Sequence, residues 1–421
     1  MDAILIDGPS RLEGTVRVSG AKNAALPILA ASVLAKGRMR LTNVPQVSDV
    51  FSMVRLLKSL GAKVGFEQGV VDIDTKSLNR NKADYRYVST MRATVCLLGP
   101  LLARFGQALV SLPGGCVIGP RPIDLHIKGL RALGAEVNLE HGYVIAEAKK
   151  PLKGNVIYLG GAYGSSVLAT ANVLMTAVLA KGRTVIESAA CEPEIVDLGK
   201  FLIRMGARIE GLGSPLIEIE GVKNLSPCDY DIIFDRIEAG SYMIAAAISR
   251  GDVTIRDVSV EALGAVADKL TEAGVQLRSN GNQLRIKSRS ALKPVSVTTL
   301  AYPGFPTDLQ AQMTALMSLT PGISVITEKI FPERFMHVSE LNRMGAQIRL
   351  EGNNAIISGA KGLSGAPVMA SDLRASAALV LAGLVAKGQT QVSRVYHLDR
   401  GYEGLVEKLK SLGAKIKRVK Q

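Results

Sequence analysis

The sequence predicts an α/β protein of two domains, built from six copies of one β-α-β-α-β-β unit. The first observation is a repeated stop, in which a short amphipathic stretch ends at a small-residue turn. The glycines at the centre of these turns are Gly61, Gly134, Gly206, Gly274, Gly345 and Gly413. Subtracting neighbouring numbers gives spacings of 73, 72, 68, 71 and 68 residues. A period near 70 residues, repeated along 421, indicates one supersecondary unit used six times.

The second observation is an earlier glycine in every unit, which follows an apolar stretch rich in Ala and Leu. These glycines are Gly37, Gly106, Gly182, Gly251, Gly322 and Gly388. Stretches such as 24–35, 166–180, 240–249 and 375–386 predict helices that are apolar nearly all round and therefore buried. Glycine just past a helix relieves the strain of a left-handed residue there. The β-branched runs that follow, such as 184–186 and 253–255, predict strands.

A second helix follows in most units, and its pattern is amphipathic. The predicted ranges are 50–60, 193–205, 261–273, 337–344 and 402–412. In the first of them Val54, Leu57 and Leu60 share one face and Arg55 and Lys58 lie on another, so these helices are expected to face solvent. Three units around an axis would enclose the apolar helices. Six units then give two similar domains with a cleft between them, and 226–231 is the expected crossover.

The charge balance favours a small anionic ligand. Lys and Arg number 51 and Asp and Glu 37, which gives 51 − 37 = +14. Such an excess suggests an acidic partner. Aromatic residues make up only 4% and there is no Trp, so stacking platforms for nucleic acid are scarce. Because the basic residues are scattered, we expect convergent side chains around a small anion and no nucleic-acid partner.

Cysteine usage and hydropathy indicate a cytosolic enzyme without a metal, a signal peptide or a membrane span. The four cysteines form no CxxC pair and show no disulfide-like spacing. Residues 154–180 lack charge, but the glycine run 160–164 argues against a membrane helix. A strand at 156–159, a glycine loop, and a helix from about 167 to 180 are predicted instead.

The clearest break in the repeat is the segment 113–126, PGGCVIGPRPIDLH. Glycines around Cys116 permit close approach to a ligand, and a tuned thiol can act as acid, base or nucleophile. A surface loop with an incidental cysteine is an equal alternative on spacing alone. Arg121, between Pro120 and Pro122, is a fork donor for phosphate or carboxylate. The segment also reads as a helix start near Asp124, and both interpretations can hold together.

Other candidates stand at the starts of helices. Lys22 precedes the first apolar helix and suits an anion, although Asn23 there can equally be a helix cap. Asp308 is more readily a cap than a catalytic group. An arginine occupies each of three similar turns, at Arg334, Arg374 and Arg400, which suggests convergence on a multiply charged anion. No Ser-His-Asp arrangement, Walker loop or metal-ligand cluster is evident.

Together these motifs resemble the enolpyruvyl transferases, over residues 14–419. The matching segments are SGAKNAALPI at 19–28, TMRA at 90–93, SLPGGCVIGPRPIDLHI at 111–127, EPEIVD at 192–197, DRIEAG at 235–240, FPTDLQAQ at 305–312, RFMHVSEL at 334–341, SDLRASAALVLAG at 371–383 and YHLDRGYE at 396–403. The resemblance implies a two-domain inside-out α/β barrel of six βαβαββ repeats. It implies a domain at 22–230 that carries the Cys116 loop, a second at 1–21 plus 231–421, and an active site in the cleft between.

The activity implied is transfer of the enolpyruvyl group of phosphoenolpyruvate to the 3-hydroxyl of UDP-N-acetylglucosamine. Phosphate leaves through a tetrahedral ketal, in the first committed step of peptidoglycan precursor synthesis, and no cofactor is implied. By resemblance, Lys22 and Arg121 grip the phosphate, and Arg334, Arg374 and Arg400 hold phosphoenolpyruvate. Cys116 is the loop cysteine of acid or covalent chemistry and the target of fosfomycin. Asp308 is the candidate base and Asp372 assists proton movement. Contacts to the nucleotide sugar or the closed loop are implied for Asn23, Arg92, Arg121, Pro122, Ile123, Asp124, Leu125 and Ile330.

One segment departs from the family pattern. Where close relatives show a lysine and an S-V-G-A turn near the uridine diphosphate, residues 160–166 read GGAYGSS. A different nucleotide or nucleotide-sugar acceptor is therefore an alternative. A 5-enolpyruvylshikimate-3-phosphate synthase does not fit PGGC and RFMHV. The charge of +14 leaves a silent relative that binds nucleic acid as a third hypothesis.

Overall fold

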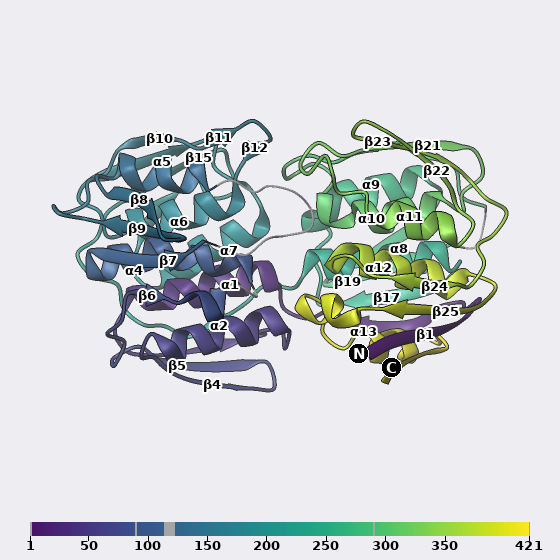
Figure 1. The fold of residues 1–421 in the computed structure, drawn as a ribbon, viewed down its shortest axis with the longest axis horizontal. Helices are drawn as coiled ribbons and strands as arrows, with labels where there is room; N and C mark the ends of the chain where they lie inside the picture. Colours follow the sequence, from purple (N-terminus) through teal and green to yellow (C-terminus); the bar gives the residue numbers. More distant parts are fainter. Residues whose placement is uncertain (1, 89–90, 113–122, 289–290, 421) are drawn as a thin grey trace. The chain divides into compact units, whose positions relative to one another are not determined.

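The computed structural model describes residues 2–88, 91–112, 123–288 and 291–420 (Figure 1). These residues divide into two compact units. The N-terminal unit comprises residues 20–112 and 123–233, and the C-terminal unit comprises 2–19 and 234–420. Each unit encloses its own hydrophobic core. The chain passes from one unit to the other after Ser19 and again after Ile233.

In its described residues the N-terminal unit contains three four-stranded sheets with one strand order. A short edge strand runs parallel to its neighbour, and the two remaining strands are antiparallel. In order across each sheet, the strands are β16 (Tyr230–Asp231), β3 (Arg38–Thr42), β5 (Val70–Asp74) and β4 (Lys63–Glu67); β6 (Lys82–Ala83), β7 (Gln107–Ser111), β9 (Tyr143–Glu147) and β8 (Glu136–Glu140); and β10 (Val156–Tyr158), β13 (Arg183–Glu187), β15 (Leu216–Glu220) and β14 (Arg208–Glu210).

The described part of the C-terminal unit repeats this pattern three times. Its sheets are β2 (Glu13–Arg17), β17 (Asp252–Arg256), β19 (Gln283–Lys287) and β18 (Gln276–Asn280); β20 (Val297–Thr298), β21 (Ile323–Thr327), β23 (Asn354–Ser358) and β22 (Gln347–Glu351); and β24 (Pro367–Met369), β25 (Gly388–Ser393), β1 (Asp2–Gly8) and β26 (Ile416–Lys420). The last sheet is completed by the start of the chain, because β1 pairs antiparallel with both β25 and β26. Both ends of the chain therefore lie in this unit (Figure 1).

Apolar helices form the interior of each unit. They are α1 (Lys22–Ala31), α4 (Leu98–Phe105) and α6 (Val167–Ala177) in the N-terminal unit and α8 (Arg236–Ile248), α10 (Gln310–Met317) and α12 (Leu373–Val385) in the C-terminal unit. Their Ala, Leu, Ile and Val side chains are buried on nearly every face, as the sequence predicts. In Figure 1, α1, α4 and α6 lie between β4 and β5 at one edge of their unit and β10 and β15 at the other.

Amphipathic helices cover the outside. They are α2 (Ser48–Ser59), α5 (Asp124–Ala132), α7 (Pro193–Arg204), α9 (Gly264–Glu272), α11 (His337–Arg343) and α13 (Leu405–Ser411). In α2, Val54 and Leu57 are buried while Arg55 and Lys58 are exposed, which confirms the predicted faces. Shorter helical turns complete the fold: α3 (Tyr85–Val88), η1 (Ser32–Leu34), η2 (Arg92–Leu97), η3 (Glu261–Leu263), η4 (Thr307–Leu309) and η5 (Val395–Arg400).

The repeated glycines have a conformational cause. All six glycines of the 70-residue period have φ between 96° and 107°, a region that side-chain-bearing residues avoid. Gly251 is an exception in the second set, since Arg250 takes the left-handed conformation with φ 51°. Glycine is needed at 251 for another reason, because a Cβ there would lie 2.2 Å from the carbonyl oxygen of Leu12.

The segment 160–166 is a correction to the predicted glycine loop. It forms a two-stranded antiparallel hairpin, β11 (Gly160–Gly161) with β12 (Gly164–Ser165), before α6 begins. Searching the described residues for a helix of membrane-spanning length and apolarity yields no candidate.

Candidate active site

A carboxylate between two arginines is the centre of the candidate site in the C-terminal unit. Asp308 lies inside η4, whose N-cap is Pro306, and the following α10 has Leu309 as its N-cap, so the helix-cap role that the sequence favours for Asp308 is wrong. Arg334 donates from Nη1 to Asp308 Oδ1 at 2.8 Å, and Arg374 donates from Nη2 to Oδ2 at 2.7 Å. Arg334 is 6% exposed and Arg374 is 3% exposed, so both guanidinium groups are stabilised mainly by the Asp308 carboxylate and only weakly by water. Three of the residues singled out from the sequence are thus brought together.

The start of α12 sets the position of Arg374. Asp372 is the N-cap, and its Oδ1 accepts from the backbone N–H groups of Arg374 at 2.8 Å and Ala375 at 3.2 Å. The Arg374 guanidinium carbon also lies 5.4 Å from the ring centroid of Tyr402, whose hydroxyl is 2.7 Å from Ser241 Oγ. Asp372, expected to assist proton movement, therefore holds the helix turn that presents Arg374.

The two arginines control the ionisation of Asp308. Burial favours the neutral acid, but the charges and hydrogen bonds of Arg374 and Arg334 outweigh this and hold the pKa of Asp308 well below its ordinary value. Burial lowers the pKa of Arg374, whereas Asp308 raises it, and the net direction is upward. The cluster therefore remains an ionised carboxylate between two cations at neutral pH.

Arg400 lies at the end of η5, which packs against α12. The contact is close, because a Cβ added at Gly401 would come within 2.6 Å of Leu373 Cδ2. The pKa of His397 is lowered, first by burial and then by the charge of Arg400. The third predicted arginine is thus carried by an element that packs on the helix of Arg374.

In the N-terminal unit, Lys22 begins α1 and is buried. Its Nζ donates to Asp49 Oδ2 at 3.0 Å. Asn23 is half-buried beside it, and no side-chain cap is made by Ala21 at this helix start. Asp49 was not predicted from the sequence, where its signal is only an acidic residue in the first turn of an amphipathic helix.

The start of α5 carries further predicted contact residues. Ile123 precedes the helix, Asp124 is exposed at its first position, and Leu125 is half-buried. Leu125 Cδ1 lies 3.2 Å from where a Cβ on Gly161 would be, so the 160–165 hairpin packs against a predicted substrate residue. His126 is buried and its Nδ1 is 2.7 Å from Asn172 Nδ2.

Some predicted residues fall outside what can be described. Cys116, Arg121 and Pro122 lie outside the described residues. Arg92 is the first residue of η2, and its side chain also lies outside the description. Within the described ranges, no group of three or more His, Cys, Asp or Glu is placed to hold a metal ion.

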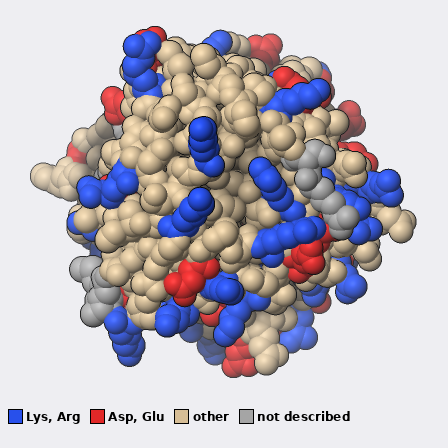
Figure 2. Space-filling model, turned by 90° about the vertical axis from the view of Figure 1, so that its right-hand side faces the viewer, with Lys and Arg blue, Asp and Glu red and all other residues tan. Residues whose placement is uncertain are grey.

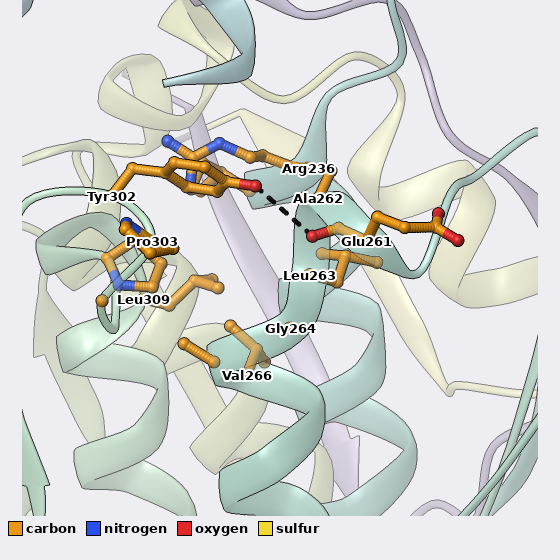
Figure 3. Close-up of a pocket in the computed structure, with 13 residues that line it drawn as sticks. Arg236, Glu261, Ala262, Leu263, Gly264, Val266, Tyr302, Pro303 and Leu309 are labelled. Atoms are coloured by element: carbon orange, nitrogen blue, oxygen red, sulfur yellow. Dashed lines mark hydrogen bonds between the residues drawn. The ribbon is translucent and has the colours of Figure 1, made fainter. Parts of the chain in front are cut away.

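A pocket of the C-terminal unit lies beside the η4 turn (Figure 3). Leu309 and Pro306 line it, together with Tyr302 and Arg236, whose guanidinium carbon is 5.4 Å from the Tyr302 ring centroid. The Tyr302 hydroxyl donates to the Glu261 carbonyl at 3.4 Å. None of the predicted catalytic residues lines this pocket.

Basic residues are spread over the surface of the C-terminal unit. Figure 2 shows Lys and Arg across one face, with Asp and Glu among them. Several form ion pairs, as Arg418 does with Asp2 and Asp399 and Arg285 does with Asp252. This distribution matches the scattered basic residues of the sequence.

Comparison with known proteins gives consistent matches over the whole chain. The family model of EPSP synthase (3-phosphoshikimate 1-carboxyvinyltransferase) matches residues 6–409. UDP-N-acetylglucosamine 1-carboxyvinyltransferase 2 of Carboxydothermus hydrogenoformans is 53% identical, and UDP-N-acetylglucosamine 1-carboxyvinyltransferase of Desulfosudis oleivorans is 54% identical. Both alignments cover 100% of this chain and 100% of the relative.

Solved structures agree in fold. The enolpyruvyl transferase NikO from Streptomyces tendae superposes with a TM-score of 0.90 at 24% identity, over 99% of each chain. EPSP synthase from Acinetobacter baumannii gives a TM-score of 0.75 at 19% identity, over 100% of each chain. At these identities the likeness establishes the mixed α/β fold.

Proposed function

We propose that this chain, which belongs to the EPSP synthase family of carboxyvinyltransferases, transfers the enolpyruvyl group of phosphoenolpyruvate to the 3-hydroxyl of UDP-N-acetylglucosamine and releases phosphate. The observation that carries the proposal is the identity of 53–54% over full length with enzymes that bear this acceptor in their names. No observation of the structure favours another acceptor.

The C-terminal cluster suits the anionic donor. Phosphoenolpyruvate carries a carboxylate and a phosphate, and guanidinium groups match both with paired hydrogen bonds. Arg334 and Arg374 already face a carboxylate, that of Asp308, at 2.8 and 2.7 Å. We assign them, with Arg400, to phosphoenolpyruvate. A substrate anion that engages either arginine then competes with Asp308 for it.

Competition between the substrate and Asp308 for the arginines would change the pKa of Asp308, the candidate base. A general base works best when its pKa is near the working pH, and Asp308 paired to two arginines is too acidic. Loss of one ion pair to the substrate raises its pKa and frees an oxygen for the acceptor hydroxyl. We therefore propose that Asp308 orients and deprotonates the 3-hydroxyl only after phosphoenolpyruvate is bound, and that Asp372 assists proton movement beside it.

The remaining roles are proposed for residues of the N-terminal unit and for Ile330 of the C-terminal unit. We propose that Lys22 and Arg121 bind the phosphate, and that Cys116 acts as general acid or nucleophile and in product release. The nucleotide-sugar contacts proposed are Asn23, Arg92, Arg121, Pro122, Ile123, Asp124, Leu125 and Ile330. The position of Lys22 at the first turn of α1 supports its part, because the free backbone N–H groups of a helix N-terminus also favour an anion.

The proposal extends to the arrangement of the repeats and to the domain boundaries. We propose an inside-out barrel pair of six βαβαββ repeats, divided as 22–230 and 1–21 plus 231–421, with residues of both domains serving one reaction in the cleft. The equal strand order of the described sheets supports the repeat.

The same proposal places the protein in the cytoplasm, at the first committed step of peptidoglycan precursor synthesis, and so in cell-wall biogenesis, cell shape and division. The cysteines described, Cys96, Cys191 and Cys228, form no disulfide, which suits a reducing compartment.

Product analysis with several acceptors tests the function. Purified protein is incubated with ¹³C-labelled phosphoenolpyruvate and one of UDP-N-acetylglucosamine, UDP-glucose, UDP or shikimate 3-phosphate, and products are identified by mass spectrometry and NMR. The expected result is a labelled enolpyruvyl ether with UDP-N-acetylglucosamine alone. An ether on another acceptor, or on none, contradicts the proposal.

Thiol labelling tests the role of Cys116. Fosfomycin, an epoxide, should alkylate Cys116 in the presence of the nucleotide sugar and protect it from other thiol reagents. The buried Cys96, whose pKa burial raises to about 12, should remain unmodified. A peptide mass spectrum without an adduct on Cys116 refutes the assignment.

A further inference from the structure

A second buried carboxylate stands behind the candidate site. Glu328 follows β21 directly, and it is 0% exposed. Its oxygens accept four hydrogen bonds, from Thr299 Oγ1 at 2.6 Å, Thr307 Oγ1 at 2.8 Å and the backbone N–H groups of Ile330 at 2.8 Å and Phe331 at 2.9 Å. One side chain therefore joins three separate segments of the C-terminal unit.

All four partners act as donors, which explains the residue type. A carboxylate offers acceptors only, whereas glutamine places an NH₂ donor at one of the two positions. The backbone of Glu328 is also fixed, because it donates to the Asn353 carbonyl at 2.9 Å and accepts from Asn353 Nδ2 at 3.2 Å. Such extensive bonding offsets the cost of burying the group.

The contact with Thr307 leads into the Asp308 cluster. The Thr307 hydroxyl has one proton, which it donates to Glu328 Oε2. Its lone pairs are thereby turned toward Arg334, whose Nη1 donates to Thr307 Oγ1 at 3.0 Å. The same Nη1 lies 2.8 Å from Asp308 Oδ1. Glu328 thus determines the direction of the hydroxyl that steadies Arg334 against Asp308.

A second contact leads to another predicted site residue. The Ile330 N–H that bonds to Glu328 Oε1 belongs to a residue assigned to the nucleotide sugar. One carboxylate therefore fixes the surroundings of Arg334, Asp308 and Ile330 without being placed to touch either substrate.

We propose that Glu328 is a positioning residue of the transfer reaction, which acts through the Thr307 hydroxyl on Arg334 and Asp308 and through the backbone on Ile330. This inference rests on the proposed function. Loosening this relay, the hydrogen-bond chain from Glu328 through Thr307 to Arg334, shifts the Arg334 guanidinium relative to Thr307 and Asp308 but keeps its charge in the cluster. Attraction of the substrate anion therefore persists while alignment is lost. The effect is therefore on kcat more than on the KM for phosphoenolpyruvate.

Kinetics of a small set of variants test the relay. Glu328→Gln and Thr307→Val should each lower kcat about 10- to 100-fold, the scale of a misaligned reacting group, with a smaller change in KM. The double variant should be no slower than the worse single variant, because both changes interrupt one path. Thr307→Ser, which keeps the hydroxyl, should restore kcat to near the wild-type value.

Thr327→Val is the matched control. It removes a neighbouring hydroxyl that donates to Asn354 Oδ1 at 2.6 Å, away from Asp308. It should leave kcat unchanged even if its melting temperature falls as much as that of Thr307→Val. Wild-type kcat in Glu328→Gln, losses that add in the double variant, or a Thr307→Ser enzyme as slow as Thr307→Val overturns the proposal.

Crystal structures of the wild type and of Glu328→Gln separate this inference from the proposed function. A wild type without activity removes the function, but the relay still predicts that Arg334 moves away from Thr307 and Asp308 in the variant. Unchanged distances from Arg334 to both residues overturn the relay whatever the activity.

Discussion

Two aspartates, one in each unit, have pKa values shifted in opposite directions. Asp308 lies between Arg334 and Arg374, and its pKa is held well below the ordinary value. Asp197, in α7, is 2% exposed and has neutral partners, the Tyr230 hydroxyl at 2.8 Å and the Ile233 N–H at 3.3 Å. Burial raises its pKa to about 6, because these hydrogen bonds do not offset the loss of water.

The difference separates a candidate reaction site from a structural one. Both aspartates lie in segments that resemble the family, FPTDLQAQ and EPEIVD, although the resemblance implies a catalytic role for Asp308 alone. Asp308 faces cations that an anionic substrate can take over. Asp197 instead holds residues 230–233, where the chain leaves the N-terminal unit. The partners of a carboxylate, more than its motif, indicate its role.

The largest expected effect is on turnover. Asp308→Asn keeps the shape but removes the base and the charge between two arginines, so kcat should fall about 10²- to 10⁴-fold. Asp197→Asn, its counterpart, keeps one acceptor oxygen and lies outside the proposed site, so it should retain nearly full activity. Steady-state phosphate release measures both. Equal losses in the two variants would break the distinction.

Substituting a residue that contacts each aspartate should have a smaller effect than replacing Asp308 itself. Arg374→Lys loses the planar fork that reaches Asp308, and kcat/KM for phosphoenolpyruvate should fall about 10- to 100-fold, the equivalent of a charged hydrogen bond. Tyr230→Phe removes the hydroxyl that donates to the Asp197 carboxylate, which is ionised above its pKa of about 6. It should lower the free energy of unfolding by about 2 kcal/mol and leave kcat/KM unchanged. Urea unfolding measures the free energy of unfolding, and initial rates measure kcat/KM. A Tyr230→Phe enzyme with impaired kcat/KM contradicts the structural role of Asp197.

The smallest effect is the dependence of stability on pH. The depressed pKa of Asp308 contributes stability that is complete above its unfolded pKa of about 3.9 and is lost as pH falls through the folded value. The raised pKa of Asp197 acts in the opposite sense, so its cost at neutral pH is relieved as pH falls from about 6 toward 4.

Unfolding of wild type, Asp308→Asn and Asp197→Asn in urea at pH 7, 5 and 3.5 measures these signs. From pH 7 to 5, wild type should gain on Asp197→Asn by at most about 1.4 kcal/mol per pH unit. Its advantage over Asp308→Asn should stay constant there and shrink only at the lowest pH. If lowering the pH changed the stability of wild type relative to both variants in the same direction, the opposite pKa shifts assigned to Asp308 and Asp197 would be refuted.

Much of the fold follows from the sequence because its signals are local. Each glycine of the 70-residue period has a left-handed φ that other residues avoid, so the turns mark the repeat directly. The apolar runs give the inner helices, as at α12, predicted over 375–386 and observed at Leu373–Val385. The hairpin at 160–165 was read as a loop because glycine-rich strands of two residues have no periodicity.

The site was predictable only in part. The arginines before helices predict an anion site, and two of them, Arg334 and Arg374, meet at Asp308. Asp49 and Glu328 were missed, because an isolated acid in a sequence does not reveal which distant cation or hydroxyl it will contact. Those contacts join residues separated by 27 and 21 positions, and only tertiary packing brings them together.

The most direct test of the central claim is release of inorganic phosphate from phosphoenolpyruvate by the purified protein, with and without UDP-N-acetylglucosamine. Enolpyruvyl transfer to this acceptor predicts phosphate in proportion to the sugar nucleotide consumed, and none when it is omitted. Release that does not depend on UDP-N-acetylglucosamine, or no release at high enzyme concentration, would contradict the account.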